Sequence, residues 1–296
     1  MIFNKLKNMN FFARRSKPIT YNFISERYNE NKKNINSLYG SQLDNYYNQI
    51  LKNKKEDLSI PADKGYYSKN FKDNLLDQLI DHTKKNFPPS FIKMNVNKKS
   101  KDNTLMPYDL NFKDSNNKIF LDFIFKKEIL PTVAGYLKSV PILFNASIWF
   151  SPNKRDGLIG SQYLHFDRED LRQIKLFVLL EDLDDECGPT CFLDSSESKQ
   201  YISENFEYKN FNLKSRIKDE ELPEQYLNNI NKVTGKMGTV YFLDTTNCLH
   251  FGSRQAKKSR YILMYHFLSP YSWKFSNLKL NINSNYQDLI LSKILN

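Results

Sequence analysis

The spacing of apolar residues changes at Ile142, and this change limits the possible folds more than any other feature of the sequence. Beyond it, short apolar or alternating runs with β-branched and aromatic residues are separated by turns, which is typical of strands. The preceding third has helical spacing instead. Several strands after a helical segment predict an α+β fold, a jelly-roll barrel buttressed by N-terminal helices. The expected strands are 142–150, 162–167, 174–180, 190–193, 239–243 and 260–268.

The helical part of the chain is expected to support this barrel. Residues 1–60 are polar and Asn-rich, and they predict a loosely attached arm with a helix over 35–53. Apolar spacing predicts helices over 69–86 and 117–138, and Pro131 predicts a kink or a break in the latter. We therefore expect one domain over 61–296, made of a helical buttress (61–140), a jelly-roll core (141–270) with a charged insert (194–237), and a C-terminal tail (271–296).

The formal net charge of +11, from 44 basic and 33 acidic residues, suits a polyanionic partner or an acidic substrate. However, the lysines form scattered pairs such as Lys84-Lys85 and no long basic run. We interpret the charge as a bias in residue usage, and we expect no nucleic-acid partner.

Three cysteines give no disulfide framework and suit a reducing compartment. No apolar run is long enough to span a membrane, so we expect a cytoplasmic protein.

Two short stretches contain the residues with the clearest chemistry. His165-Phe166-Asp167 lies in an expected strand, in which residues i and i+2 point to the same side. His165 and Asp167 can therefore bind one metal together. His250 follows the expected strand 239–243 and a turn, and it supplies a second imidazole. Two histidines and one carboxylate are the set that holds a non-haem Fe(II) on one face and leaves the other face open.

His266 is the competing third ligand. It lies inside the expected strand 260–268 and shares a face with Arg260. We prefer His250, because Arg260 then follows the third ligand on the next strand and can point into the same cavity. A guanidinium in that place would bind a carboxylate of a co-substrate. His266 is then interpreted as a core or strand-end histidine with its hydrogen bonds satisfied.

Four stretches between residues 145 and 270 together resemble the phytanoyl-CoA hydroxylase family of Fe(II)/2-oxoglutarate dioxygenases. Two departures are clear: Asp194-Ser195-Ser196-Glu197 stands where the family often has Pro-Gly-Ser-His, and Ser253 follows the distal histidine by three residues rather than two. The similar stretches are the first metal motif (162–167), the next strand and its turn (175–183 with Gly188-Pro189), the distal histidine segment (244–253), and Arg260.

The resemblance implies a double-stranded β-helix, a cupin-like barrel, that uses Fe(II), 2-oxoglutarate and O2. Such an enzyme would hydroxylate a small molecule and release succinate and CO2. His165, Asp167 and His250 would hold the iron, Arg260 would pair with the far carboxylate of 2-oxoglutarate, and Ser253 is a further candidate for co-substrate binding. The carboxylate of Asp167 argues against a halogenase, in which a small residue makes room for chloride.

Lys175 and Phe177 share one face of the expected strand 174–180. Lys175 is either a cationic group in the cavity, which binds 2-oxoglutarate or an acidic substrate, or a strand-end lysine that extends to solvent. Phe177 either lines the co-substrate pocket or packs in the core, and Trp149 has the same two interpretations for the substrate pocket.

A second class of function stays open, a catalytically silent jelly-roll that binds a sugar or a nucleic acid. The net charge is its only support, and it gives no reason for His165, Asp167, His250 and Arg260 to occur together. The sequence does not identify the substrate: an acyl-CoA, a sugar or nucleotide sugar, an amino-acid derivative and a phosphonate all fit. The oligomeric state is equally open.

Overall fold

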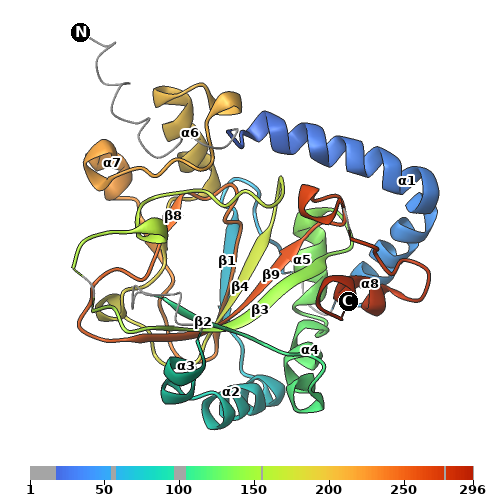
Figure 1. Cartoon of the computed structure of the whole chain (residues 1–296), viewed down its shortest axis with the longest axis horizontal. Helices are drawn as coiled ribbons and strands as arrows, with labels where there is room; N and C mark the ends of the chain where they lie inside the picture. Colours follow the sequence, from blue (N-terminus) through green and yellow to red (C-terminus); the bar gives the residue numbers. More distant parts are fainter. Residues whose placement is uncertain (1–17, 55–57, 97–104, 155, 277, 296) are drawn as a thin grey trace.

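The structure is a computed structural model that describes residues 18–54, 58–96, 105–154, 156–276 and 278–295. A six-stranded antiparallel sheet lies at its centre, in the order β1-β7-β4-β9-β3-β2 (Figure 1). A smaller antiparallel sheet has the order β6-β5-β8. The large sheet contains β1 (Tyr66–Asn70), β2 (Met106–Asp109), β3 (Ile142–Ser151), β4 (Ile174–Leu179), β7 (Thr239–Leu243) and β9 (Arg260–Leu268); the small sheet contains β5 (Cys191–Phe192), β6 (Asn231–Lys232) and β8 (His250–Phe251).

Strand alternation gives the large sheet two different faces. On β4, Leu176 and Val178 pack in the same core cluster as the helices, whereas Phe177 belongs to a cluster shared with Phe192 of the small sheet. β9 alternates in the same way, because successive side chains of a strand point to opposite faces. One face of the large sheet is therefore covered by helices, and the other faces the small sheet. This inner face also includes Lys175, Arg260 and His266, as strand alternation predicts.

Helices cover the outer face of the large sheet (Figure 1). The break predicted at Pro131 is observed, because one helix ends at Ile124 and the next begins at Leu130 with Pro131 in its first turn. The helices that contribute to this cluster are α1 (Tyr21–Lys52), α2 (Asn74–Asn86), α3 (Pro89–Asn95), α4 (Lys118–Ile124), α5 (Leu130–Leu137) and α8 (Tyr286–Leu295).

The N-terminal segment differs from the expectation of a loosely attached arm. α1 spans 32 residues, begins at an N-cap in which Thr20 Oγ1 accepts from Phe23 N at 3.1 Å, and buries Leu43, Tyr46 and Ile50 in the main core. Four buried residues on one helix are enough to hold it, although most of its surface is polar. The first 17 residues of the expected arm lie outside the described part of the chain.

Two other expected elements also differ. The helix predicted over 69–86 begins only at Asn74, where Asp73 caps it by accepting from Leu75 N and Leu76 N. Lys69 and Asn70 instead pair with β7 as the end of β1, so strand pairing overrides local helical spacing. The strand predicted over 162–167 consists only of isolated bridges, from Leu164 to Ile217 and from His165 to His250.

The expected insert, 194–237, supplies strand β6 of the small sheet and packs against β5 and β8. Its helices α6 (Ser195–Asn205) and α7 (Glu224–Leu227) lie at the end of the molecule away from α8 (Figure 1). Tyr201, Phe211 and Ile217 of the insert share a buried cluster with Leu164 and Phe166 of the metal motif. The insert is therefore packed directly against the segment that contains His165 and Asp167.

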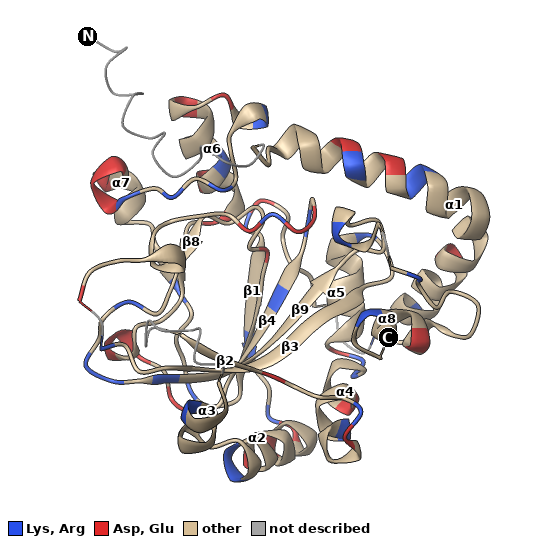
Figure 2. Cartoon of the chain, in the orientation of Figure 1, with Lys and Arg blue, Asp and Glu red and all other residues tan. Residues whose placement is uncertain are grey.

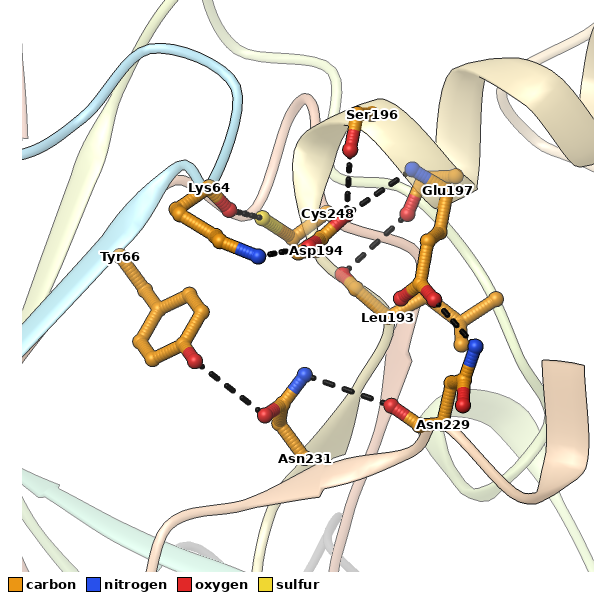
Figure 3. A network of polar contacts seen from close by, with 10 residues as sticks. Lys64, Tyr66, Leu193, Asp194, Ser196, Glu197, Asn229, Asn231 and Cys248 are labelled. Carbon is orange, nitrogen blue, oxygen red and sulfur yellow. Dashed lines mark hydrogen bonds and ion pairs between the residues drawn. The ribbon is translucent and has the colours of Figure 1, made fainter.

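A polar network fixes the beginning of α6 (Figure 3). Asp194 caps the helix by accepting from Glu197 N at 2.9 Å, and its other oxygen pairs with Lys64 Nζ at 3.1 Å. The carbonyl of Lys64 accepts from Cys248 Sγ at 3.5 Å, so the same network reaches the segment just before His250.

Lys and Arg are interspersed with Asp and Glu over the helices and loops, while the large sheet is nearly free of charge (Figure 2). Among the described residues, no helix has both the length and the apolar character to span a bilayer.

Candidate metal centre

His165, Asp167 and His250 form a cluster that could hold a metal ion, with one ligand atom of each within 4.8 Å of the others. His165 and His250 lie directly opposite each other, because each backbone N–H donates to the carbonyl of the other at 3.0 Å. Their ring centroids are 4.3 Å apart. Two residues further along, Asp167 N donates to Thr245 O at 2.9 Å. The segment 165–167 therefore runs beside the loop that precedes His250, and both histidines point to the same place.

The two imidazoles are oriented so that they could bind a metal ion. Nδ1 of His165 lies 2.8 Å from Tyr163 O, and Nδ1 of His250 lies 2.9 Å from Cys248 O. A carbonyl oxygen only accepts, so each Nδ1 has the proton and each Nε2 has a free lone pair. Burial lowers the pKa of His165 to about 3 and that of His250 to about 4. Both rings are therefore neutral at physiological pH, which is the form that binds a metal.

Asp167 supplies the carboxylate of the cluster. Burial alone would raise its pKa, but the Lys175 ammonium and the two imidazoles hold that pKa well below its usual range. Asp167 Oδ2 lies 2.5 Å from Lys175 Nζ and 3.7 Å from His250 Nε2. The cluster thus contains two neutral nitrogen ligands and one anionic oxygen ligand, which together suit a divalent transition metal.

A buried aspartate shapes the loop that leads to His250. Asp244 accepts from Tyr136 Oη and Asn247 Nδ2, both at 2.7 Å, and from Thr246 N at 2.9 Å. Its carbonyl accepts from Cys248 N at 2.9 Å. These bonds fold the chain into the turn that the sequence predicts after β7. Burial raises the pKa of Asp244, and the hydrogen bonds from Tyr136 and Asn247 partly oppose that shift.

Arg260 is a buried cation whose described partners are all neutral. Its Nη1 donates to Thr190 Oγ1 at 2.8 Å, and its Nη2 donates to Ser253 Oγ at 2.5 Å and to Ser151 Oγ at 3.3 Å. Only 2% of the residue is exposed, and burial lowers its pKa to about 10. Ser253 adopts a left-handed backbone conformation, with φ of 59°, where it contacts the guanidinium. In the described part of the chain, no carboxylate forms an ion pair with Arg260.

A cavity of about 250 Å³ connects the triad to Arg260. The structure thus brings together every site residue that the sequence predicts, because the same cavity is lined by His165, Asp167, Lys175, Phe177, His250, Ser253 and Arg260. Phe177 and Trp149 meet edge to face, with ring centroids 5.9 Å apart, and both also line the cavity. Pocket lining and core packing are therefore combined in these two aromatic residues.

His266 lies outside the ligand cluster. It sits opposite Lys175 in the β4–β9 register and meets the Phe144 ring edge-on at 5.2 Å. Burial lowers its pKa to about 3, with a further contribution from Lys175. It is a core histidine, as expected, but the expectation of satisfied hydrogen bonds is wrong, since its buried Nε2 has no partner within the described residues.

Several cavity residues could not be found from the sequence. Ser151 becomes a partner of Arg260 only because β3 pairs with β9 in the register that places the two residues opposite each other. Thr190 comes from the turn before β5, and Arg216 comes from the insert. Arg168 and Glu169 follow the metal motif directly, and their nearness to Asp167 was the one available signal.

No protein-family model matches this chain, and no curated protein matches it by sequence. The resemblance to the phytanoyl-CoA hydroxylase family therefore stays a prediction. Solved structures do match. EctD from S. alaskensis in its apoform is similar with a TM-score of 0.51 and 15% identity, over 73% of this chain and 79% of that one. EctD with 2-oxoglutarate and 5-hydroxyectoine gives 0.50 and 14%, over 74% and 80%.

HygX from Streptomyces hygroscopicus with nickel and 2-oxoglutarate bound gives a TM-score of 0.45 at 13% identity, over 70% of this chain and 84% of that one. The similarity to EctD, with a TM-score of 0.51 at 15% identity, shows a shared fold. The predicted α+β class, with helices packed on antiparallel sheet, is confirmed to that extent.

Proposed function

We propose that the protein is an Fe(II)/2-oxoglutarate-dependent oxygenase that hydroxylates a small molecule. The observation that supports this best is the shared cavity of the His165–Asp167–His250 cluster and Arg260. The fold similarity to EctD, which has been solved with 2-oxoglutarate and 5-hydroxyectoine, agrees with it. We also infer that the two sheets are the two walls of a double-stranded β-helix, with the buried cluster of Phe177 and Phe192 between them.

The residues present fit a bound iron. One ligand atom of each of the three residues lies within 4.8 Å of the others, and all three residues line the cavity that also contains Arg260. Iron with 2-oxoglutarate and O2 would supply the oxidising power for hydroxylation, with release of succinate and CO2. The carbonyls of Tyr163 and Cys248 hold the imidazoles in the binding tautomer and orientation.

Arg260 fits the far carboxylate of 2-oxoglutarate. Its guanidinium is fully buried and is bonded to three hydroxyls, so a carboxylate would provide the charge partner that the described residues do not. Ser253 orients the guanidinium, and its hydroxyl lines the same cavity. Phe177 and Trp149 limit water around the co-substrate. Lys175, on the same cavity wall, is placed to contact an anionic group of the co-substrate or of the substrate.

Anaerobic iron binding tests the ligand set. His165→Ala, Asp167→Ala and His250→Ala should each lose most of the bound iron, whereas His266→Ala should keep it. His266→Ala is a matched control, because that imidazole is equally buried and lies opposite Lys175 on β9, outside the cavity lining. Full iron binding by His250→Ala together with loss of iron in His266→Ala would show that His266, and not His250, is the third ligand.

Turnover tests the reaction class. The iron-loaded protein should release succinate from 2-oxoglutarate when O2 is present, and the His250→Ala variant should not. A catalytically silent binding protein of the same fold would contain no stoichiometric iron and would release no succinate. An enzyme that uses the triad without 2-oxoglutarate would bind iron but would leave 2-oxoglutarate unconsumed.

A further inference from the structure

Two arginines, Arg168 and Arg216, line the cavity beside the triad, and we call them the rim pair. Arg168 follows Asp167 directly and is half-buried. Arg216 comes from the insert and is exposed. The insert holds it in place through a bridge to the metal motif, in which Leu164 N donates to Ile217 O at 3.1 Å and Ile217 N donates to Leu164 O at 2.9 Å. The insert thus forms part of the cavity wall.

Neither guanidinium of the rim pair forms an ion pair with a carboxylate among the residues that the structure describes. Among the described residues, the acceptors of Arg216 are all backbone carbonyls: Nε donates to Gly160 at 3.1 Å, and Nη1 donates to Ser215 at 3.2 Å and to Lys214 at 3.4 Å. Its neighbour Arg254 shows what a structural arginine does in this region. Arg254 makes a two-pronged pair with Asp219 at 2.7 and 2.8 Å and stacks on Phe251.

The rim pair also brings like charges together. Partial burial lowers the pKa of Arg216 and the positive charge of Arg168 lowers it further, while the negative charge of Asp167 raises it. Glu169, the nearest acidic residue in sequence besides Asp167, uses its carboxylate to accept from the backbone N–H of Arg168 at 2.9 Å. Two neighbouring cations that form no ion pair with a described carboxylate repel each other, and a bound anion would relieve that repulsion. Arginine forks match carboxylate and phosphate oxygens in geometry as well as charge.

We propose that Arg168 and Arg216 form an anion-binding site at the rim of the cavity, and that the substrate is a small molecule with a carboxylate or phosphate group held there. This inference rests on the proposed function, because the site binds a substrate only if the triad does chemistry beside it. The anionic group fixes one end of the substrate, and the rest of the molecule then extends toward the triad. It is a separate site from Arg260, which lies at the inner end and is 2% exposed.

Binding of simple anions tests the site. The protein is loaded with Ni²⁺, which prevents turnover, and with saturating 2-oxoglutarate, and is then titrated calorimetrically with inorganic phosphate and, separately, with acetate. At least one anion should bind saturably, and Arg168→Ala and Arg216→Ala should each weaken it by about tenfold or more. Arg216→Lys should fall between wild type and Arg216→Ala. The anion that binds more tightly, phosphate or acetate, shows whether the site prefers a phosphate or a carboxylate group.

Lys218→Ala is the matched control, because Lys218 is an exposed cation of the same loop that does not line the cavity. It should leave anion binding unchanged. The proposal is overturned if neither anion binds the wild type, if both arginine variants bind as tightly as the wild type, or if Lys218→Ala weakens binding equally. Failure of Ni²⁺ or 2-oxoglutarate to bind instead contradicts the proposed function, and the titration repeated without them still tests the two arginines.

Discussion

Replacement of Arg260 by methionine should separate the stability of the protein from its affinity for 2-oxoglutarate. Methionine keeps much of the volume of the side chain and removes the buried charge. In the ligand-free protein, burial lowers the pKa of Arg260 from 12.5 to about 10, so the charged form is disfavoured in the fold by about 3 kcal/mol. Against this, the variant loses the hydrogen bonds to Thr190, Ser253 and Ser151, worth about 1 kcal/mol each.

The two contributions nearly cancel, so the free energy of unfolding of ligand-free Arg260→Met should stay within about 2 kcal/mol of wild type. The affinity for 2-oxoglutarate should change far more. A buried carboxylate that loses its guanidinium partner costs about 3–5 kcal/mol, which corresponds to a loss of roughly 10²- to 10⁴-fold. Iron binding should be nearly intact, because Arg260 is outside the ligand cluster.

Chemical denaturation gives the unfolding free energy, and anaerobic calorimetry on the iron-loaded protein gives the 2-oxoglutarate affinity. Arg260→Lys is the control, since it keeps a charge but loses the two-pronged geometry of a guanidinium. Its affinity for 2-oxoglutarate should lie between those of wild type and Arg260→Met. An unchanged KM or Kd for 2-oxoglutarate in Arg260→Met would remove this residue from the co-substrate site. A variant that unfolds before iron binds would refute the reasoning about the buried charge.

Three further predictions concern charge. Lys175→Met should keep iron but weaken either 2-oxoglutarate binding or product formation, because the ammonium lies on the cavity wall beside Asp167; wild-type kinetics in both assays would contradict a role for it. Burial raises the pKa of Asp170 to about 7, so the folded state binds its proton more tightly than the unfolded state. The stability of wild type relative to Asp170→Asn should therefore fall by about 3 kcal/mol as pH rises from 4 to 7. A difference that is flat with pH would contradict this. Finally, DNA or RNA should bind only weakly at physiological salt, and a salt-sensitive submicromolar affinity would show that the +11 charge is a nucleic-acid footprint.

The sequence predicts most reliably what depends on alternation within one strand. β7 and β9 have the predicted bounds, and the inner face that contains Lys175 and Arg260 follows from a period of two residues. The sequence fails where a partner strand or a distant segment decides the structure. Lys69 and Asn70 have helical spacing but pair with β7, and nothing local shows that α1 is held by Leu43, Tyr46 and Ile50.

The polar partners of the site were unpredictable for the same reason. Ser151 and Thr190 contact Arg260 through strand register and a turn, so neither residue has a local signal. Arg216 was hidden in a charged insert, where a solvated lysine and a cavity arginine look alike in sequence. Its role becomes visible only when the Leu164–Ile217 bridge places the insert against the metal motif.

The structure brings His165, Asp167 and His250 together even though the strand assumed for residues 162–167 is not present as such. Segment 162–167 makes isolated bridges only, yet His165 pairs with His250 and Asp167 N bonds to Thr245 O. Residues 165 and 167 both bond to the segment 245–250, as alternate residues of a strand bond to a neighbouring strand. The side chains of His165 and Asp167, two residues apart, therefore point to the same side. The prediction that His165 and Asp167 share a side therefore needs only strand-like spacing, not a complete ladder of hydrogen bonds. The position of His250 depends on more, because the buried turn at Asp244 sets where His250 points, and a sequence pattern shows such a turn but not its hydrogen bonds.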